Sequence, residues 1–235
     1  MNKKIIVTLS ALSLSFTAQA NWYAGINLGI NDVNIEKKLT YPNDEVQPTS
    51  SHFYNTYTNF HGQLTAGYEF LFPNLIGLAL EGNADFFAGE SKYTVNNWFF
   101  STDVRAKEKL RYGFGLFILP EYQFNPFMRV FAGPGIETAQ FAINFNNTAG
   151  DVGVSGKDKD WLTGWALKVG TAGRICNNTD LVFTYQFTQY ESLTQTRMEP
   201  LSGDFLRGRY KPYVNLFMIG LKYNLPDGTV NYVTK

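Results

Sequence analysis

This sequence has too few cysteines for a disulfide, too few histidines and cysteines for a metal cluster, and no excess of basic residues for binding nucleic acid. Cys176 is the only cysteine, so the chain cannot form an intramolecular disulfide. His52 and His61 are the only histidines, and neither lies at the spacing of a metal-binding cluster. Lysine and arginine number 20 and the acidic residues also number 20, so no basic excess favours nucleic acid. We expect no metal, no cofactor and no nucleic-acid partner.

Long hydrophobic runs are also missing outside the N-terminus. Residues 5–16 form an apolar stretch that follows two lysines and precedes Ala18-Gln19-Ala20, the small-residue pattern of a cleavage site. This predicts a cleaved signal peptide over residues 1–20; a short membrane anchor is the alternative, but the run falls below the roughly 20 residues that a spanning helix needs. In the rest of the chain the longest apolar run, residues 112–120, is shorter still. A helical membrane protein is therefore excluded.

Aromatic residues and glycine are abundant instead. The chain is 16% aromatic and contains 21 glycines, although its mean hydropathy is only −0.20. Apolar and polar residues alternate in eight segments, which is the period of a β-strand. The eight predicted strands are residues 22–31, 60–71, 75–87, 109–123, 127–137, 160–174, 180–190 and 209–225.

The connections between these segments alternate between short and long. Short Pro/Asn turns lie at 72–74, 125–126 and 177–179. Long polar segments, predicted as loops, lie at 32–59, 88–108, 144–159 and 192–208. In an up-and-down barrel the short turns all fall at one end and the long loops at the other. The sequence therefore predicts an all-β fold, an eight-stranded antiparallel up-and-down transmembrane β-barrel over residues 21–225, followed by a short tail at 226–235.

The polar face of the strands carries both signs of charge and many glycines. If this face pointed outward, the protein would be a soluble barrel of the lipocalin kind. Glycine suits the crowded interior of a small barrel, and balanced charges can pair across the lumen. The predicted lumen polar network consists of Glu69, Glu81, Asp85, Arg111, Glu121, Arg129, Glu137, Lys168, Arg174 and Lys222. Bulky inward residues, Phe117, Leu119 and Phe131, favour a filled lumen over a water-filled conduit.

The aromatic residues of the apolar face gather near the ends of the strands. Aromatic girdles occur where a membrane barrel crosses the lipid headgroups. The predicted girdle consists of Trp22, Phe60, Phe70, Tyr112, Tyr122, Trp161, Trp165, Tyr213 and Tyr223. The apolar face, including Leu110 in the fourth strand, is thus predicted to face lipid.

Three stretches carry a resemblance to a known family: WYAGINLGIN at 22–31, FHGQLTAGYEF at 60–70 and YVNLFMIGLKYNL at 213–225. With the signal sequence, they resemble the small eight-stranded outer-membrane β-barrels of the OmpA-like and opacity-protein type. The resemblance implies location in the bacterial outer membrane, with its lipids, lipopolysaccharide and the barrel-assembly machinery as partners. The chain departs from the family in ending with PDGTVNYVTK rather than an aromatic residue, and a tail of this length is too short for a peptidoglycan-binding domain.

Catalytic residues are hard to find. A lipid-modifying enzyme would need a nucleophile with a histidine base oriented by an acid, and His61 has only Glu81 or Asp85 within predicted reach across the lumen. We therefore expect a non-enzymatic surface protein whose four long loops serve adhesion, antigenicity or envelope structure, with a narrow channel or a lipid-modifying enzyme as the alternatives. Basic residues border two predicted loops: Arg105, Lys107, Lys109, Arg197, Arg207, Arg209 and Lys211. These are interpreted either as contacts to lipopolysaccharide phosphates or an acidic host or envelope ligand, or as solvated cations at the headgroups.

Overall fold

Ten antiparallel strands make up the protein in a computed structural model that describes residues 19–41, 49–72, 75–97, 102–147, 156–198 and 205–225. The strands are β1 (Gln19–Tyr41), β2 (Thr49–Leu71), β3 (Ile76–Phe87), β4 (Ser91–Asn97), β5 (Thr102–Asn125), β6 (Met128–Asn147), β7 (Gly156–Cys176), β8 (Thr179–Tyr190), β9 (Leu193–Met198) and β10 (Phe205–Asn224). None of these ranges contains a helix that is long and apolar enough to cross a membrane. Residues 1–18 and 226–235 lie outside the described residues, so the signal peptide and the tail stay predictions.

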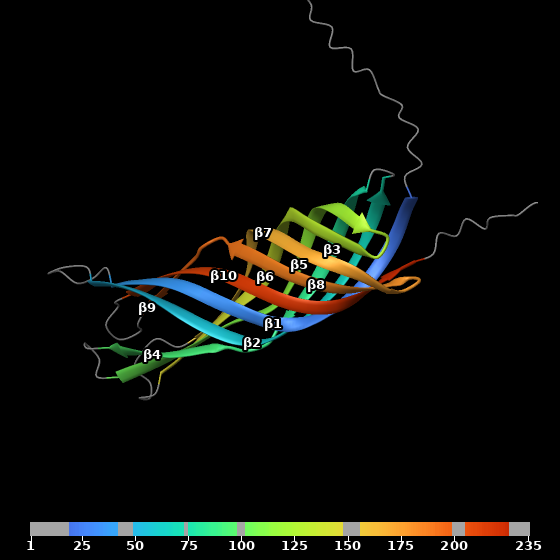
Figure 1. The fold of residues 1–235 in the computed structure, drawn as a ribbon. Helices are drawn as coiled ribbons and strands as arrows, with labels where there is room; N and C mark the ends of the chain where they lie inside the picture. Colours follow the sequence, from blue (N-terminus) through green and yellow to red (C-terminus); the bar gives the residue numbers. More distant parts are fainter. Residues whose placement is uncertain are drawn as a thin grey trace, which may run out of the picture.

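Eight of the strands close into a ring (Figure 1). The order is β1-β2-β3-β5-β6-β7-β8-β10, and β10 pairs again with β1. Strand β4 pairs with β5, and β9 pairs with β10, outside this ring. The predicted all-β, eight-stranded antiparallel up-and-down barrel is confirmed.

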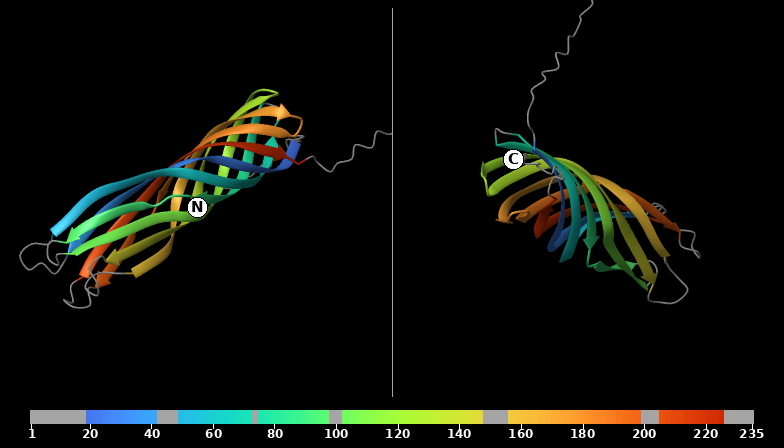
Figure 2. Two further views of the ribbon diagram at one scale, coloured as in Figure 1. Left: turned by 90° about the horizontal axis from the view of Figure 1, so that it is seen from below. Right: turned by 90° about the vertical axis from the view of Figure 1, so that its right-hand side faces the viewer.

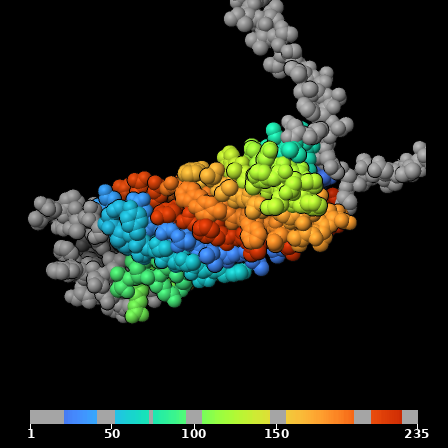
Figure 3. Space-filling model, viewed as in Figure 1, coloured from blue at the N-terminus to red at the C-terminus, as the bar shows by residue number. Residues whose placement is uncertain are grey.

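One end of the barrel carries tight turns. Between β5 and β6 the Asn125 side-chain oxygen accepts hydrogen bonds from the backbone N–H groups of Phe127 and Met128, at 2.8 and 2.9 Å. An Asx-type turn of this kind satisfies the backbone locally. Figure 3 shows the long axis of the molecule, with the β5–β6 and β7–β8 turns at one end and the first residues of β2 at the other.

The prediction of long loops at the opposite end is wrong for most of the residues described there. Strands β1, β2 and β5 continue far into the segments predicted as loops, and β6, β7 and β10 overlap them at 144–147, 156–159 and 205–208. Strands β4 and β9 lie wholly within them. We call this region, the described residues of 32–59, 88–110, 138–160 and 191–215, the extension. Its strands project beyond the ring as ordered β-structure (Figure 2).

The extension reverses the polarity of the barrel, and β1 shows how. Up to Ile30 the apolar residues face outward, and Asn27 and Asn31 are buried inside. From Val33 onward the apolar residues are buried inside, while alternate polar residues such as Lys38 face outward. An apolar outer face suits lipid, and a polar outer face with an apolar interior suits water. The reversal therefore marks the level at which the barrel leaves the membrane.

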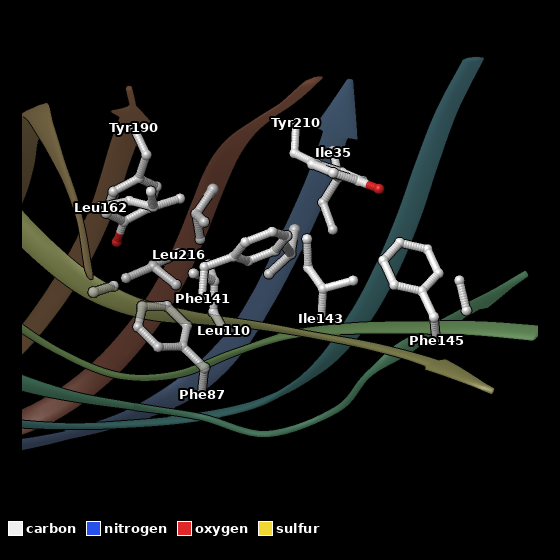
Figure 4. Packing of buried hydrophobic residues seen from close by; sticks show 14 of the residues in the cluster. Ile35, Phe87, Leu110, Phe141, Ile143, Phe145, Leu162, Tyr190, Tyr210 and Leu216 are labelled. Atoms are coloured by element: carbon white, nitrogen blue, oxygen red, sulfur yellow. The ribbon is translucent and has the colours of Figure 1, made fainter. Parts of the chain in front are cut away.

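A hydrophobic core fills the extension and continues into the adjoining end of the ring (Figure 4). Its buried members are Val33, Ile35, Leu39, Phe87, Ala106, Leu110, Ala139, Phe141, Ile143, Phe145, Leu162, Tyr190, Tyr210, Val214, Leu216 and Met218. Burial of this much apolar surface explains why segments of polar average composition form strands instead of loops.

The extension consists of two ladders that face each other across this core. Strand β8 ends at Tyr190 and β3 ends at Phe87, so neither strand reaches into the extension. The ring of paired strands is therefore interrupted there at two positions. In the part of the chain described, β9-β10-β1-β2 form one ladder and β4-β5-β6-β7 form the other. Side chains bridge the two seams between the ladders: Gln195 donates to Asp160 at 3.1 Å, and the Tyr57 hydroxyl accepts from the Leu110 N–H at 3.0 Å.

Candidate functional site

The lumen near the short turns is crossed by an ion network centred on Arg129. This guanidinium donates to Glu69 at 2.9 Å and to Asp180 at 2.5 Å, and its Nε lies 3.6 Å from a Glu121 oxygen. Lys222 donates to the second oxygen of Glu69. All five side chains are almost fully buried, and they come from five different strands of the ring. A buried charge needs such partners because burial without them is very costly.

A second ion pair lies beside the first network. Lys168 donates to Glu81 at 2.7 Å, and the Tyr23 hydroxyl donates to the other Glu81 oxygen at 2.9 Å. The Lys168 ammonium also lies 4.0 Å from the centre of the Phe117 ring. Arg174 lies at the mouth of the barrel, where its side chain is 39% exposed.

In the middle of the lumen, hydrogen bonds from uncharged amide and hydroxyl side chains to two carboxyl groups replace the ion pairs. Asp85 accepts from Gln63 at 2.8 Å and lies 2.9 Å from Nε2 of His61. Asn27 donates to Gln63 at 2.9 Å, and Gln63 donates to Gln186 at 3.3 Å, which extends the network across the lumen.

Glu137 lies at the far side of the same layer. Its oxygens accept hydrogen bonds from Gln186 and Thr188, both at 2.6 Å, and from the Tyr190 hydroxyl at 2.7 Å. Three donors satisfy a buried carboxylate without a cation beside it. Together with the ion networks, this layer fills the lumen with bonded side chains.

Little free space is left between the layers. A cavity of about 20 Å³ lies among Asn27, Gln63, Glu81 and Lys168. That volume accommodates about one water molecule. The bulky side chains of Phe117, Leu119 and Phe131 are buried inside the same part of the barrel.

Arg111 is the exception among the predicted lumen residues, and its predicted position is wrong. A β-bulge between Leu110 and Gly113 changes which residues of β5 face inward. Leu110, predicted to face lipid, is fully buried in the core of the extension. Arg111 lies on the outside, where it donates to the outward-facing Gln140 at 3.0 Å. A bulge inserts one extra residue and so reverses the alternation, which the sequence pattern did not reveal.

The predicted girdle residues all face outward. Trp22, for example, exposes 61% of its surface and Trp165 exposes 56%. Near the short turns Trp22 packs edge-on against Tyr68 at 4.9 Å, and near the extension Tyr112 packs against Trp161 at 5.3 Å. The remaining predicted members, Phe60, Phe70, Tyr122, Tyr213 and Tyr223, also lie on the outer face.

Neither histidine sits in a recognisable catalytic arrangement within the described part of the chain. His61 is fully buried against Asp85, and its Nδ1 has no hydrogen-bond partner there. His52 lies on the outer face of the extension, 3.0 Å from Glu36. Among the described residues, no group of three or more His, Cys, Asp or Glu side chains could hold a metal ion.

An ion pair that sequence reasoning missed lies inside the apolar core of the extension. Lys37 of β1 contacts Glu108 of β5, and both side chains are fully buried. The Lys37 ammonium also lies 3.5 Å from the centre of the Tyr93 ring. Burial lowers the pKa of Lys37 to about 8, against the opposing effect of Glu108, and burial raises the pKa of Glu108. Lys37 alternates with Ile35 and Leu39 on the inward face of β1. A lysine at the middle position of an apolar alternation is the sequence feature that could have predicted a buried cation.

The outer face of the β4–β7 ladder is strongly basic. Its outward cations are Lys92, Arg105, Lys107, Lys109, Arg111, Lys157 and Lys159. Three of these residues border a segment predicted as a loop, but they lie on a strand of a regular sheet. Glu90 lies between two of the cations, 3.0 Å from Lys92 and 3.6 Å from Lys107, and the bond from Lys92 lowers the pKa of its carboxyl.

Comparison with known proteins identifies relatives at the level of family and fold. The family model described as the outer membrane protein beta-barrel domain matches residues 5–224. No curated protein matches the sequence. A major outer membrane protein from Thermus thermophilus is 14% identical with a TM-score of 0.51, covering 88% of this chain and 100% of that chain.

Two further structures are more distant. OprG from Pseudomonas aeruginosa is 12% identical with a TM-score of 0.47, covering 86% of this chain and 95% of that chain. Neisserial surface protein A is 10% identical with a TM-score of 0.45, covering 88% of this chain and 99% of that chain. At such identities the likeness is one of fold alone.

Proposed function

This chain belongs to the outer membrane protein β-barrel family and lies in the bacterial outer membrane, and we propose that it is a non-enzymatic surface protein whose extension presents a binding surface outside the cell. The observation that carries the proposal is the apolar core of the extension. A segment that only connects transmembrane strands needs no core of its own. An interior packed with large apolar side chains holds the outer faces in a fixed arrangement, as binding surfaces require.

The reach of the extension supports a role beyond the lipid headgroups. Strand β1 runs from Asp32 to Tyr41 after the polarity reverses. Ten residues of strand extend about 33 Å, at roughly 3.3 Å per residue. The outer faces of both ladders therefore stand clear of the hydrocarbon layer.

The filled lumen disfavours the channel as the main function. Arg129, Glu69 and Lys222 cross the barrel as a bonded network, and the neighbouring cavity is about the size of one water molecule. An ion would have to break several buried ion pairs to pass. We propose that the network, together with the buried apolar side chains beside it, closes the barrel.

The proposed partners follow from this location. Outer-membrane lipids and lipopolysaccharide surround the apolar band, and the barrel-assembly machinery inserts the strands. The extension would contact a ligand on a host cell or elsewhere in the envelope. A lipid-modifying activity has little support, because His61 is buried without a nucleophile among the contacts found for it.

Selective labelling of intact cells tests the orientation and exposure on which this function depends. Lys38 is exposed on the extension, and the native Cys176 is exposed at the opposite end of the barrel. We expect a membrane-impermeant maleimide to label Lys38→Cys in a Cys176→Ser background on intact cells. The wild-type Cys176 serves as the matched control and should react only after the cells are opened.

Two results would contradict the proposal. Labelling of Cys176, but not of the cysteine at position 38, on intact cells would place the extension in the periplasm. Reproducible single-channel steps of the purified protein in planar bilayers would show an open lumen and favour the channel.

A further inference from the structure

Building on the proposed surface function, we propose that the outer face of the β4–β7 ladder binds the phosphate groups of lipopolysaccharide in the leaflet around the barrel. The ligand chemistry is a lipid carrying several phosphates. The binding surface is the basic face defined above, and its main contacts are Lys107, Lys109 and Lys159.

The charge on this face is nearly all of one sign. Seven cations lie on it, and Glu90 is the only carboxylate among its described side chains. A further acid, Glu191, lies at the margin, where its oxygen accepts from the Thr163 N–H at 3.1 Å. Asp158 and Asp160 alternate with the β7 lysines and therefore face the interior. The face is thus complementary to an anion with several negative charges.

The strand register brings the cations together. Lys92 on β4 is directly opposite Lys107 on β5. Lys107 is opposite Asn144 on β6, which in turn is opposite Lys157 on β7. Side chains opposite each other on neighbouring strands have Cβ atoms about 5 Å apart, and like charges at that distance destabilise a sheet. Glu90 offsets part of the repulsion between Lys92 and Lys107, because its carboxyl oxygen lies 3.0 Å and 3.6 Å from their ammonium groups. A bound phosphate would add a second anion beside this row of cations.

A second row lies closer to the membrane. Lys109 and Lys159 flank Ala142, whose small side chain leaves space between the two ammonium groups. Lys159 lies two positions from the girdle residue Trp161, and Arg111 is the neighbour of Tyr112. Two strand positions correspond to about 7 Å. The lower cations therefore lie at the level of lipid headgroups, which is why we commit to a lipid phosphate.

The other ladder provides the contrast. Its outward cations, Lys38, Arg207, Arg209 and Lys211, are interspersed with Asp32 and Glu36. Glu36 is directly opposite Lys211, so part of this charge is neutralised within the sheet. Three cations of this ladder make a matched control for three cations of the basic face.

Lipid titration of the purified full-length protein tests the proposal, with fluorescence of Trp161 and the other tryptophans as the signal. The probes are lipid A with two phosphates and the same lipid after dephosphorylation. We expect the phosphorylated form to bind more tightly to the wild type. The triple variant Lys107→Ala/Lys109→Ala/Lys159→Ala should bind it about 100-fold more weakly, because each basic residue near an anionic membrane surface contributes roughly a fivefold factor and three such factors multiply.

Controls separate charge from folding. The variant Lys38→Ala/Arg209→Ala/Lys211→Ala should retain nearly wild-type affinity, and replacing Lys107, Lys109 and Lys159 by arginine should preserve binding. Each variant is first checked for the heat-dependent shift in gel mobility of a folded barrel. If the triple alanine variant fails that check, Lys109→Ala and Lys159→Ala are titrated singly, and each should weaken binding several-fold.

Three outcomes would overturn the proposal. The first is equal affinity for phosphorylated and dephosphorylated lipid A, and the second is an equal loss of affinity in the two triple alanine variants. The third is tight binding of soluble heparin that depends on the basic face, with no binding of lipid A. The last outcome would assign the face to a soluble polyanion. None of these results changes the maleimide labelling, so failure of this inference can be distinguished from failure of the proposed surface function.

Discussion

Lys37 of β1 and Glu108 of β5 form an ion pair across the core of the extension and so join its two ladders. The side chains around them are mainly apolar, and Tyr93 covers the ammonium group. A buried pair of this kind contributes little net stability, but each charge is costly when the other is removed. The pair therefore makes the stability of the extension sensitive to single substitutions and to pH.

Glu108→Gln should destabilise the extension by about 3–5 kcal/mol, because it leaves the Lys37 ammonium buried without its counter-ion. The double variant Lys37→Met/Glu108→Leu should be far less affected. The measurement is limited proteolysis in a urea series, followed at extension sites. The transmembrane ring should keep its heat-dependent mobility in both variants. Equal protease sensitivity of the single and double variants would show that the pair does not couple the ladders.

The pH dependence of the extension should show a minimum between the two titrations. The pKa of Lys37 is lowered from 10.5 to about 8, so its contribution to stability is present above pH 10.5 and lost as the pH falls through about 8. The pKa of Glu108 is raised, so its contribution is present below pH 4.5 and lost as the pH rises.

Urea midpoints of the extension, recorded from pH 5 to pH 10, check this expectation. The midpoint should rise as the pH increases above about 8, and the free energy of unfolding should rise with it by up to about 1.4 kcal/mol per pH unit for one proton. The double variant Lys37→Met/Glu108→Leu lacks both groups and should lose the rise. If the urea midpoint of the wild type decreases as the pH rises above 8, the charged form of Lys37 is the one favoured inside the core.

Arg129→Gln should lower the stability of the ring itself. The substitution leaves Glu69, Asp180 and Glu121 without the cation that bridges them, and a loss of about 3–5 kcal/mol is expected for a broken buried network. Arg174→Gln is the matched control, because that side chain is 39% exposed and contacts Asp180 only at 3.6 Å. The temperature of the gel-mobility shift measures the effect. Similar shifts in both variants would argue against a special role for the buried network.

The sequence was sufficient to predict the transmembrane ring because each strand there obeys one alternation. In β1, Ile26 and Ile30 face outward and Asn27 and Asn31 face inward, as lipid outside and hydrogen-bonding partners inside require. The same alternation places Glu69 and Arg129 in one lumen, although they come from strands far apart in the sequence. What the pattern alone could not supply is which carboxylate each cation meets.

The extension was missed because its alternation has the opposite sense. Val33, Ile35 and Leu39 are separated by polar residues, and the segment as a whole is polar enough to resemble a loop. At Leu110 a bulge also exchanges the inward and outward positions within a single strand. Both effects depend on where the membrane ends and on pairing between strands, which a local pattern does not contain.

Gly133→Ala should impair assembly of the barrel, whereas Gly173→Ala should not. A Cβ atom at Gly133 would lie 1.9 Å from the Ile118 carbonyl oxygen on the neighbouring strand, so the backbones of β5 and β6 would have to separate. A Cβ atom at Gly173 would meet nothing within 4 Å. The yield of heat-modifiable barrel after refolding, compared at equal protein concentration, measures the difference. Equal yields would mean that β5 and β6 can move apart without opening the ring, and the close fit at Gly133 would then not limit folding.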